Sequence, residues 1–196
     1  NDLLLGMSPN DVVNVKKTSS AEPPAPPIRY KKADIAFYAL KDMSNETADW
    51  LAGLSGTIDF GLEANLTSAV SERLVPFTGI LKVQNPYAVS LVKGLKKREK
   101  ELYYSGNFLT EDMAQMLVEY KGAVEVSNLL AKYPQALETL AKKPDKLVIN
   151  APRTDKMPFR ESFFRSMSKK KGYLTIRIED YYHKKEFDLL KERNDT

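Results

Sequence analysis

A cluster of prolines near the amino terminus divides the chain into two parts of different character. Four prolines fall within residues 23–27, and proline lacks the N–H group that helices and sheet interiors need. We therefore expect this segment to be extended, in the polyproline II conformation, which needs no internal hydrogen bonds. The sequence predicts a flexible proline-rich arm over residues 1–27 and a single globular domain over residues 28–196.

Hydrophobic periodicity in the second part predicts both strands and helices. The strands are expected at residues 35–40, 57–60, 78–83, 146–151 and 174–179. The helices are expected from Ser44 to just before Gly56, at 62–74, at 86–104, in pieces over 110–143, at 158–167 and at 184–193. We find no internal repeats and no regular alternation of strands with helices. This order predicts an α+β fold, with a small, largely antiparallel sheet packed with several helices.

Charge is the most informative property of the expected domain. The chain carries 30 Lys and Arg against 26 Asp and Glu, a net charge of +4, so any attraction to anions depends on how the cations cluster. A first cluster recurs at helical spacing on the polar side of the helix expected at 86–104, and consists of Lys93, Lys96, Lys97 and Lys100. We interpret it as a cationic face, with a simple solvated surface as the alternative.

A second cluster surrounds the helix expected at 158–167 and the turn after it. It consists of Arg160, Arg165, Lys169, Lys170 and Lys171. Near an anionic leaflet each Lys or Arg contributes roughly 1 kcal/mol, so two converging clusters predict reversible, salt-sensitive binding to an anionic membrane or to a ribonucleoprotein. Phe159, Phe163 and Phe164 lie between the charges and belong either to the core or to a membrane-inserting surface, and a Phe pair at four-residue spacing favours the core.

Residues suited to catalysis are scarce. The chain has no cysteine and one histidine, His183, and no Gly-x-Ser-x-Gly or phosphate-binding loop is present. The acidic pairs Glu111-Asp112 and Glu179-Asp180 are more simply capping or solvated groups. We therefore expect a non-enzymatic protein without cofactor or metal. The lack of cysteine favours a reducing compartment such as the cytoplasm.

The arm carries two features that suit a partner. One is the apolar run Leu3, Leu4 and Leu5. The other is the pattern formed by Pro24, Pro27 and Arg29, followed by Tyr30, which has the PxxPxR spacing that SH3-type domains bind. The arm is thus either a spacer or a ligand for a proline-binding domain of the host.

Three stretches of the sequence resemble rhabdovirus matrix proteins. They are "IRYKKADIAFYAL", "ETADWLAGL" and "INAPRTDKMPFRESFFRSMSKKKGYLTIRIEDYY", and they lie within about residues 28–55 and 148–190. The resemblance implies a compact α+β body and a structural protein of the virion. Such a protein lies at the inner face of the membrane in the host cytoplasm, binds the viral ribonucleoprotein and self-associates by docking its arm on the next copy. The chain departs from the family in having no PPxY motif and no lysine-rich extreme amino terminus.

The sequence therefore supports two hypotheses of different classes. The first is a non-enzymatic viral matrix-like assembly protein that binds anionic membrane or nucleocapsid through the two basic clusters. The alternative is an adaptor or nucleic-acid-associated module that recruits an SH3-type partner through its arm.

Overall fold

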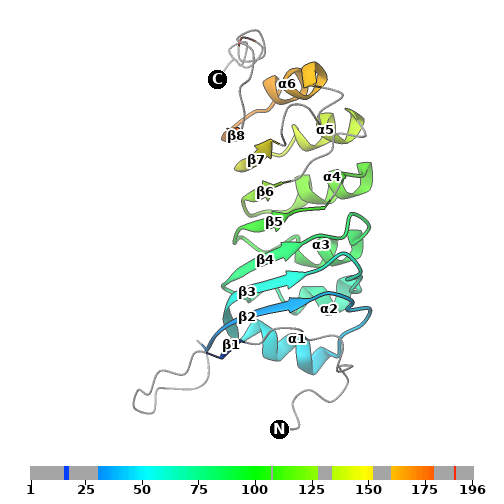
Figure 1. Ribbon diagram of the computed structural model, residues 1–196, viewed down its shortest axis with the longest axis vertical. Helices are drawn as coiled ribbons and strands as arrows, with labels where there is room; N and C mark the ends of the chain where they lie inside the picture. Colours follow the sequence, from blue (N-terminus) through cyan, green and yellow to red (C-terminus); the bar gives the residue numbers. More distant parts are fainter. Residues whose placement is uncertain are drawn as a thin grey trace.

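The sheet contains its strands in the order in which they occur in the sequence. The computed structural model describes residues 16–17, 31–106, 108–127, 134–151, 160–178 and 188. In these residues the strands form one sheet in the order β1 to β8, and the helices from α2 to α6 stack along one face of it (Figure 1). Each helix connects two neighbouring strands, so the molecule grows in one direction, one strand and one helix at a time.

The bounds of the elements are as follows. The strands are β1 (Lys16–Lys17), β2 (Lys31–Phe37), β3 (Leu54–Phe60), β4 (Ile80–Val83), β5 (Leu102–Tyr104), β6 (Val124–Val126), β7 (Leu147–Ala151) and β8 (Leu174–Ile178). The helices are α1 (Asn45–Ala52), α2 (Ser68–Glu72), α3 (Val89–Leu95), α4 (Glu111–Glu119), α5 (Pro134–Leu140) and α6 (Arg160–Ser168).

The predicted α+β class with a largely antiparallel sheet is wrong. Every pairing from β2 to β8 is parallel, and only the two-residue β1 pairs antiparallel with its neighbour. The helix expected at 86–104 contains both α3 and β5, and the stretch expected at 110–143 contains α4, β6 and α5. Since β5 and β6 have three residues each, they are too short to show a two-residue period, and overlooking them hid the regular α/β alternation.

The expectation that the chain has no repeats is also wrong. Leu81, Leu102, Val124 and Leu147 occupy one rung position in four successive strands, and they lie 21, 22 and 23 residues apart. A repeat of this length, with one strand and one helix each, is typical of solenoid proteins. What repeats is the pattern of buried positions. Because leucine, isoleucine and valine fit a rung equally well, the amino acids at these positions differ from one repeat to the next.

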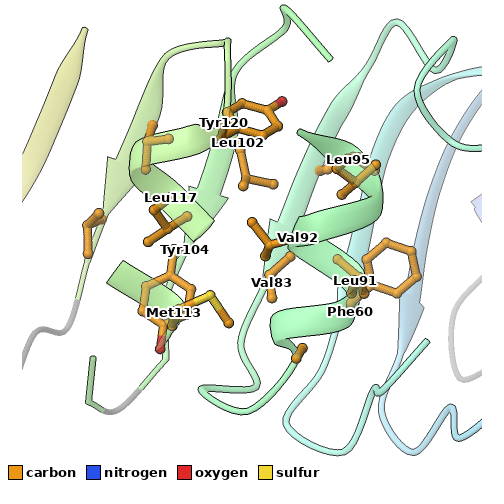
Figure 2. Close-up of a cluster of buried hydrophobic side chains, with 14 of the residues drawn as sticks. Phe60, Val83, Leu91, Val92, Leu95, Leu102, Tyr104, Met113, Leu117 and Tyr120 are labelled. Atoms are coloured by element: carbon orange, nitrogen blue, oxygen red, sulfur yellow. The ribbon is translucent and has the colours of Figure 1, made fainter. Parts of the chain in front are cut away.

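Two rows of inward-facing strand residues and one face of each helix form the core. The first row runs through Ile58, Leu81 and Leu102, and the second through Phe60, Val83 and Tyr104, all of them 0% exposed. Figure 2 shows side chains from α3 and α4 meeting these rows. Phe163 and Phe164 are likewise 0% exposed and stack edge to face, so both belong to the core, whereas Phe159 lies outside the described residues.

Parallel strands and returning helices give the solenoid two different long edges. We call the edge where helices end and strands begin the amino edge, and the opposite edge, where strands end and helices begin, the carboxyl edge. Neighbouring turns of the amino edge are in contact, since the Lys121 backbone N–H donates to the Lys96 carbonyl at 3.1 Å. Residues from turns that are distant in sequence therefore lie in one row along each edge.

Candidate functional site on the amino edge

The first predicted cluster is exposed but does not form a helical stripe. Since α3 ends at Leu95, only Lys93 belongs to the helix, while Lys96, Lys97 and Lys100 lie in the turn that leads to β5. All four lysines are exposed. The predicted spacing on one helix is thus wrong, although the predicted solvent exposure of the cluster is confirmed.

The second predicted cluster lies mostly on the same edge. Lys169 and Lys171 are exposed in the turn between α6 and β8, and Arg165 is exposed on α6, where it pairs with Glu161 at 2.7 Å. Lys170 is only 3% exposed and donates to the Lys171 carbonyl, so its prediction as a surface cation is wrong. Arg160 begins α6, but its side chain lies outside what the structure describes.

The predicted residues of the arm, Leu3, Leu4, Leu5, Pro24, Pro27, Arg29 and Tyr30, all lie outside the described residues. His183 and the pair Glu179-Asp180 lie outside them as well. The other acidic pair, Glu111-Asp112, is exposed in the first turn of α4, where carboxylates stabilise the helix dipole.

Three further lysines, which the sequence did not single out, complete the row on the amino edge. They are Lys121, Lys142 and Lys146, which lie in the turns before β6 and β7. Together with the predicted residues they give eight exposed lysines in four successive turns, at Lys96, Lys97, Lys100, Lys121, Lys142, Lys146, Lys169 and Lys171. We call this set the lysine row. The same turns, 96–101, 120–123, 141–146 and 169–173, carry three carboxylates, so the edge is strongly positive.

Two grooves between helix ends concentrate this charge. One groove, of about 370 Å³, is lined by Lys93, Lys96, Lys97 and Glu72. In this groove the Lys97 ammonium lies 3.1 Å from the Glu72 carboxylate. Exposed ion pairs of this kind contribute little energy and are screened by salt, so three lysines against one carboxylate leave the groove cationic.

The second groove lies three repeats further along, between the ends of α5 and α6. It has a volume of about 380 Å³ and is lined by Glu138, Lys142, Lys169 and Lys171 together with Ala141. Its one ion pair, between Lys169 and Glu138, is long at 3.9 Å. The two predicted clusters thus each line a groove, with the same ratio of three lysines to one carboxylate.

A buried row of cations and aromatic rings lies just inside the lysine row. Arg98, Tyr120 and Lys143 each lie four residues before the first inward-facing residue of a strand, so they are neighbours in successive repeats. The Arg98 guanidinium lies 5.9 Å from the ring centre of Phe77, and the Lys143 ammonium lies 5.8 Å from that of Tyr120. The chain thus alternates ring and cation at this position in Phe77, Arg98, Tyr120 and Lys143.

Arg98 connects three turns through its hydrogen bonds. Its Nε donates to the Phe77 carbonyl at 3.2 Å, and another nitrogen donates to the Gly79 carbonyl, both in the preceding turn. The remaining bonds go to the Glu101 carbonyl at 2.8 Å in its own turn and to the Tyr120 hydroxyl at 2.9 Å in the following one. Because these bonds join three successive turns, Arg98 fixes the turns that carry the lysine row.

Lys143 is the second cation of the buried row. Its side chain is 0% exposed, and its ammonium donates to the Tyr120 carbonyl and lies 3.8 Å from the Asp145 carboxylate. The pKa of Lys143 is lowered from 10.5 to about 8, mainly by burial and in part by the nearby charge of Lys170, while Asp145 opposes the change. The sequence pattern that marks these residues is a Lys or Arg four residues before an inward-facing strand residue. This pattern can be recognised only when the positions of the strands are known.

The part of the chain that the structure describes offers little for catalysis or metal binding. Within it, no group of three or more His, Asp or Glu side chains is placed to hold a metal ion. No helix in the described ranges is both long and apolar enough to cross a membrane. What the amino edge can do chemically is bind anions, through ammonium groups held on rigid turns.

Comparison with known proteins identifies no family. No family model matches the chain, and neither the curated proteins nor the solved structures contain a significant match. The site is therefore interpreted from its own geometry and charge.

Proposed function

We propose that this protein is a non-enzymatic assembly protein that attaches reversibly to anionic membrane surfaces through its amino edge. The observation that supports this proposal is the lysine row, in which four successive turns of a rigid solenoid present eight exposed lysines. The same turns carry three carboxylates, and two more, Glu72 and Glu138, pair with Lys97 and Lys169 from the adjacent helices, so the lysines remain in excess. Cations at helix ends also stabilise the helices, but that role is satisfied by one or two charges per helix and does not require an excess along a whole edge.

The charge of the lysine row is sufficient for this attachment. Each lysine near an anionic leaflet contributes roughly 1 kcal/mol, so four or five of the eight in contact at once would give a dissociation constant of about 0.2 to 1 mM. The attraction falls off within a Debye length, about 10 Å at 0.1 M salt. Binding of this kind is reversible and salt-sensitive, which suits a protein that must assemble and be released.

Exposed apolar side chains at the same edge favour a membrane over a nucleic acid. Trp50 in the last turn of α1, Ile80 at the start of β4 and Tyr173 just before β8 are 36%, 39% and 62% exposed. Tryptophan and tyrosine favour the boundary between lipid headgroups and acyl chains. Tyr173 also lies beside a member of the lysine row, with the Lys146 ammonium 5.7 Å from its ring centre.

The proposal rests on the charge geometry of the amino edge and takes nothing from the resemblance to rhabdovirus matrix proteins. A place in the virion, binding to a viral ribonucleoprotein and self-association through the arm remain predictions of that resemblance. The alternative adaptor function remains a prediction too, because its PxxPxR pattern lies outside the described residues.

Co-sedimentation with vesicles tests the proposal. We expect the protein to bind phosphatidylcholine vesicles that contain phosphatidylserine, to ignore pure phosphatidylcholine, and to dissociate as salt is raised from about 0.1 M to about 1 M, where the Debye length is about 3 Å. The variant Lys142→Glu/Lys171→Glu reverses two charges of the second groove and should weaken binding by at least about 30-fold, since two lost lysines correspond to roughly 2 kcal/mol.

A matched control makes the same change of charge elsewhere. Lys41→Glu/Lys82→Glu reverses one lysine in the turn after β2 and one on the open face of the sheet, both away from the amino edge. It should retain more affinity than the groove variant by about tenfold or more. Equal losses in the two variants would show that net charge alone matters, and no binding by the unchanged protein would end the proposal.

A further inference from the structure

The carboxyl edge presents a row of exposed apolar side chains. Tyr38, Leu62 and Tyr87, from the turns after β2, β3 and β4, are 53%, 52% and 67% exposed. Tyr87 also meets the next turn, because its ring packs edge to face against Phe108, with ring centres 5.7 Å apart. Large apolar groups that recur at one edge, turn after turn, are typical of a surface that contacts another protein.

The charge of the carboxyl edge is opposite to that of the amino edge. The exposed carboxylates in its turns and in the first helical turns are Asp42, Glu46, Glu63, Glu111 and Asp112. Among the described residues of the segments 38–46, 61–68, 84–90 and 105–112, the one cation is Lys41. Acidic residues at helix starts stabilise the helix dipoles, and because all the helices point the same way, they collect on a single edge.

Hydrogen bonds hold these turns rigidly to one another. The Asn65 backbone N–H donates to the Leu40 carbonyl at 3.3 Å, and the Asn85 side-chain amide donates to the Ala64 carbonyl at 2.9 Å. The Thr110 hydroxyl donates to the Pro86 carbonyl at 3.4 Å. A surface fixed in this way loses little conformational entropy on binding, which favours association.

We propose that the carboxyl edge of one copy binds the amino edge of a second copy. Acidic and apolar turns on the first copy face lysine-bearing turns on the second, and the rings of Tyr38 and Tyr87 are suited to receive lysine ammonium groups. Both edges belong to the same repeats, so their turns have related spacing and can align turn by turn. Long-range attraction between the two charged edges also guides the copies together.

The positions of the charges set the offset between the copies. The acidic turns of the described chain follow β2, β3 and β5, and the turn after β4 contributes the exposed ring of Tyr87, whereas the turns of the lysine row precede β5 to β8. Four turns therefore face four turns when the second copy is shifted by three repeats. Such a contact joins different surfaces and leaves a free edge on each copy, so assembly continues in an open, staggered array and is not limited to a dimer.

This inference is independent of the proposed membrane binding, but the two share the lysine row. Anionic vesicles and a second copy would compete for the amino edge of each molecule. A copy at the end of an array retains a free amino edge and could bind lipid, whereas copies within the array could not.

Sedimentation velocity of the full chain without lipid tests the inference. We expect the unchanged protein at low salt to form species that grow with concentration and dissociate as salt is raised. The variant Glu63→Lys/Asp112→Lys removes the acidic excess of the carboxyl edge, whose described segments then carry three carboxylates and three lysines. The variant Lys142→Glu/Lys171→Glu removes most of the basic excess of the amino edge, whose turns then carry six exposed lysines and five carboxylates. Each variant alone should remain monomeric, with a dissociation constant raised at least about tenfold.

Mixing the two variants gives the decisive result. In an equimolar mixture, the unchanged amino edge of the first variant meets the unchanged carboxyl edge of the second, so heterodimers should assemble although neither variant assembles alone. The control Gln115→Lys/Gln135→Lys adds charge to exposed positions on α4 and α5 and should assemble like the unchanged protein. Leu62→Ser/Tyr87→Ser, which changes no charge, should weaken assembly as well.

Several results would overturn the inference. The first is that the unchanged protein stays monomeric at low salt at every concentration. The second is that the mixture of the two variants fails to assemble. The third is that assembly survives both charge reversals but is lost when residues 1–27 are removed. The last result would assign self-association to the arm, and the first would leave the carboxyl edge to a foreign basic protein. Circular dichroism of each variant confirms that it is folded before it is compared.

Discussion

Replacing Arg98 should weaken the whole amino edge from within. The side chain is 1% exposed, and its guanidinium satisfies the carbonyls of Phe77, Gly79 and Glu101 and binds the Tyr120 hydroxyl. In Arg98→Met the aliphatic stem is kept, but three carbonyls lose a charged donor, of which that of Phe77 is buried and those of Gly79 and Glu101 are partly buried. The Tyr120 hydroxyl keeps its own donation to the Lys100 carbonyl at 2.6 Å.

The size of the effect follows from these contacts. A buried acceptor left without a partner costs about 1–3 kcal/mol, and since two of the three carbonyls are only partly buried, the three together would cost about 3–6 kcal/mol. Removing a buried charge recovers part of its desolvation penalty, which brings the expected loss in the free energy of unfolding to about 4 kcal/mol. Arg98→Lys retains the charge but only one nitrogen, and should lose about half as much.

Urea unfolding followed by far-UV circular dichroism measures this loss. With a denaturant dependence of about 2 kcal/mol per molar urea, Arg98→Met should lower the midpoint by about 2 M. The control Lys100→Met alters an exposed neighbour and should change stability by no more than about 0.5 kcal/mol. If Arg98→Met costs less than about 1 kcal/mol, the buried row does not hold the turns together, and the rigidity on which both proposals depend is lost.

Two further predictions concern the same scaffold. The folded pKa of Lys143, about 8, lies below its ordinary value of 10.5, so the unfolded chain binds more protons in this interval and stability should rise with pH above 8. Urea unfolding at increasing pH, kept below the ordinary tyrosine pKa of 10.0, should show this rise in stability. Lys143→Met should lack the rise. If the stability of the variant rose with pH as steeply as that of the unchanged protein, Lys143 would not be the group that titrates. Gly56 has φ of 114°, and a Cβ added there would clash with the Ala33 carbonyl oxygen, so Gly56→Ala should cost at least about 2 kcal/mol in the same assay. A cost below about 0.5 kcal/mol would contradict the close approach of β2 and β3.

Several local features of the fold were predictable from the sequence. Ser44 and Thr110 cap α1 and α4 through their hydroxyls, as their positions before apolar-periodic segments indicated. The apolar alternation around residue 176 corresponds to β8. These features depend on residues within one turn or one strand, so the local sequence contains the information needed.

The solvent exposure of most predicted lysines could also be predicted from the sequence, but their grouping along one edge could not. Lys97 and Lys169 are 72 residues apart, and each lines a groove on the same edge only because the intervening strands pair in parallel. Lys170 belongs to a run of three lysines that looks uniformly exposed. Its burial depends on the neighbouring turn, so no local pattern distinguishes it from Lys169 and Lys171.

By itself, the sequence determined which side of each segment is apolar, where several helices begin, and that the chain carries exposed lysines without the groups of a common active site. The tertiary structure decided that the strands are parallel and sequential, that β5 and β6 exist, and that scattered cations form one edge. A three-residue strand has too few hydrogen bonds to be stable alone and forms only between two neighbours already in place. Parallel order, and with it the separation of charge between the two edges, is therefore a property of the assembled repeats and of no single segment.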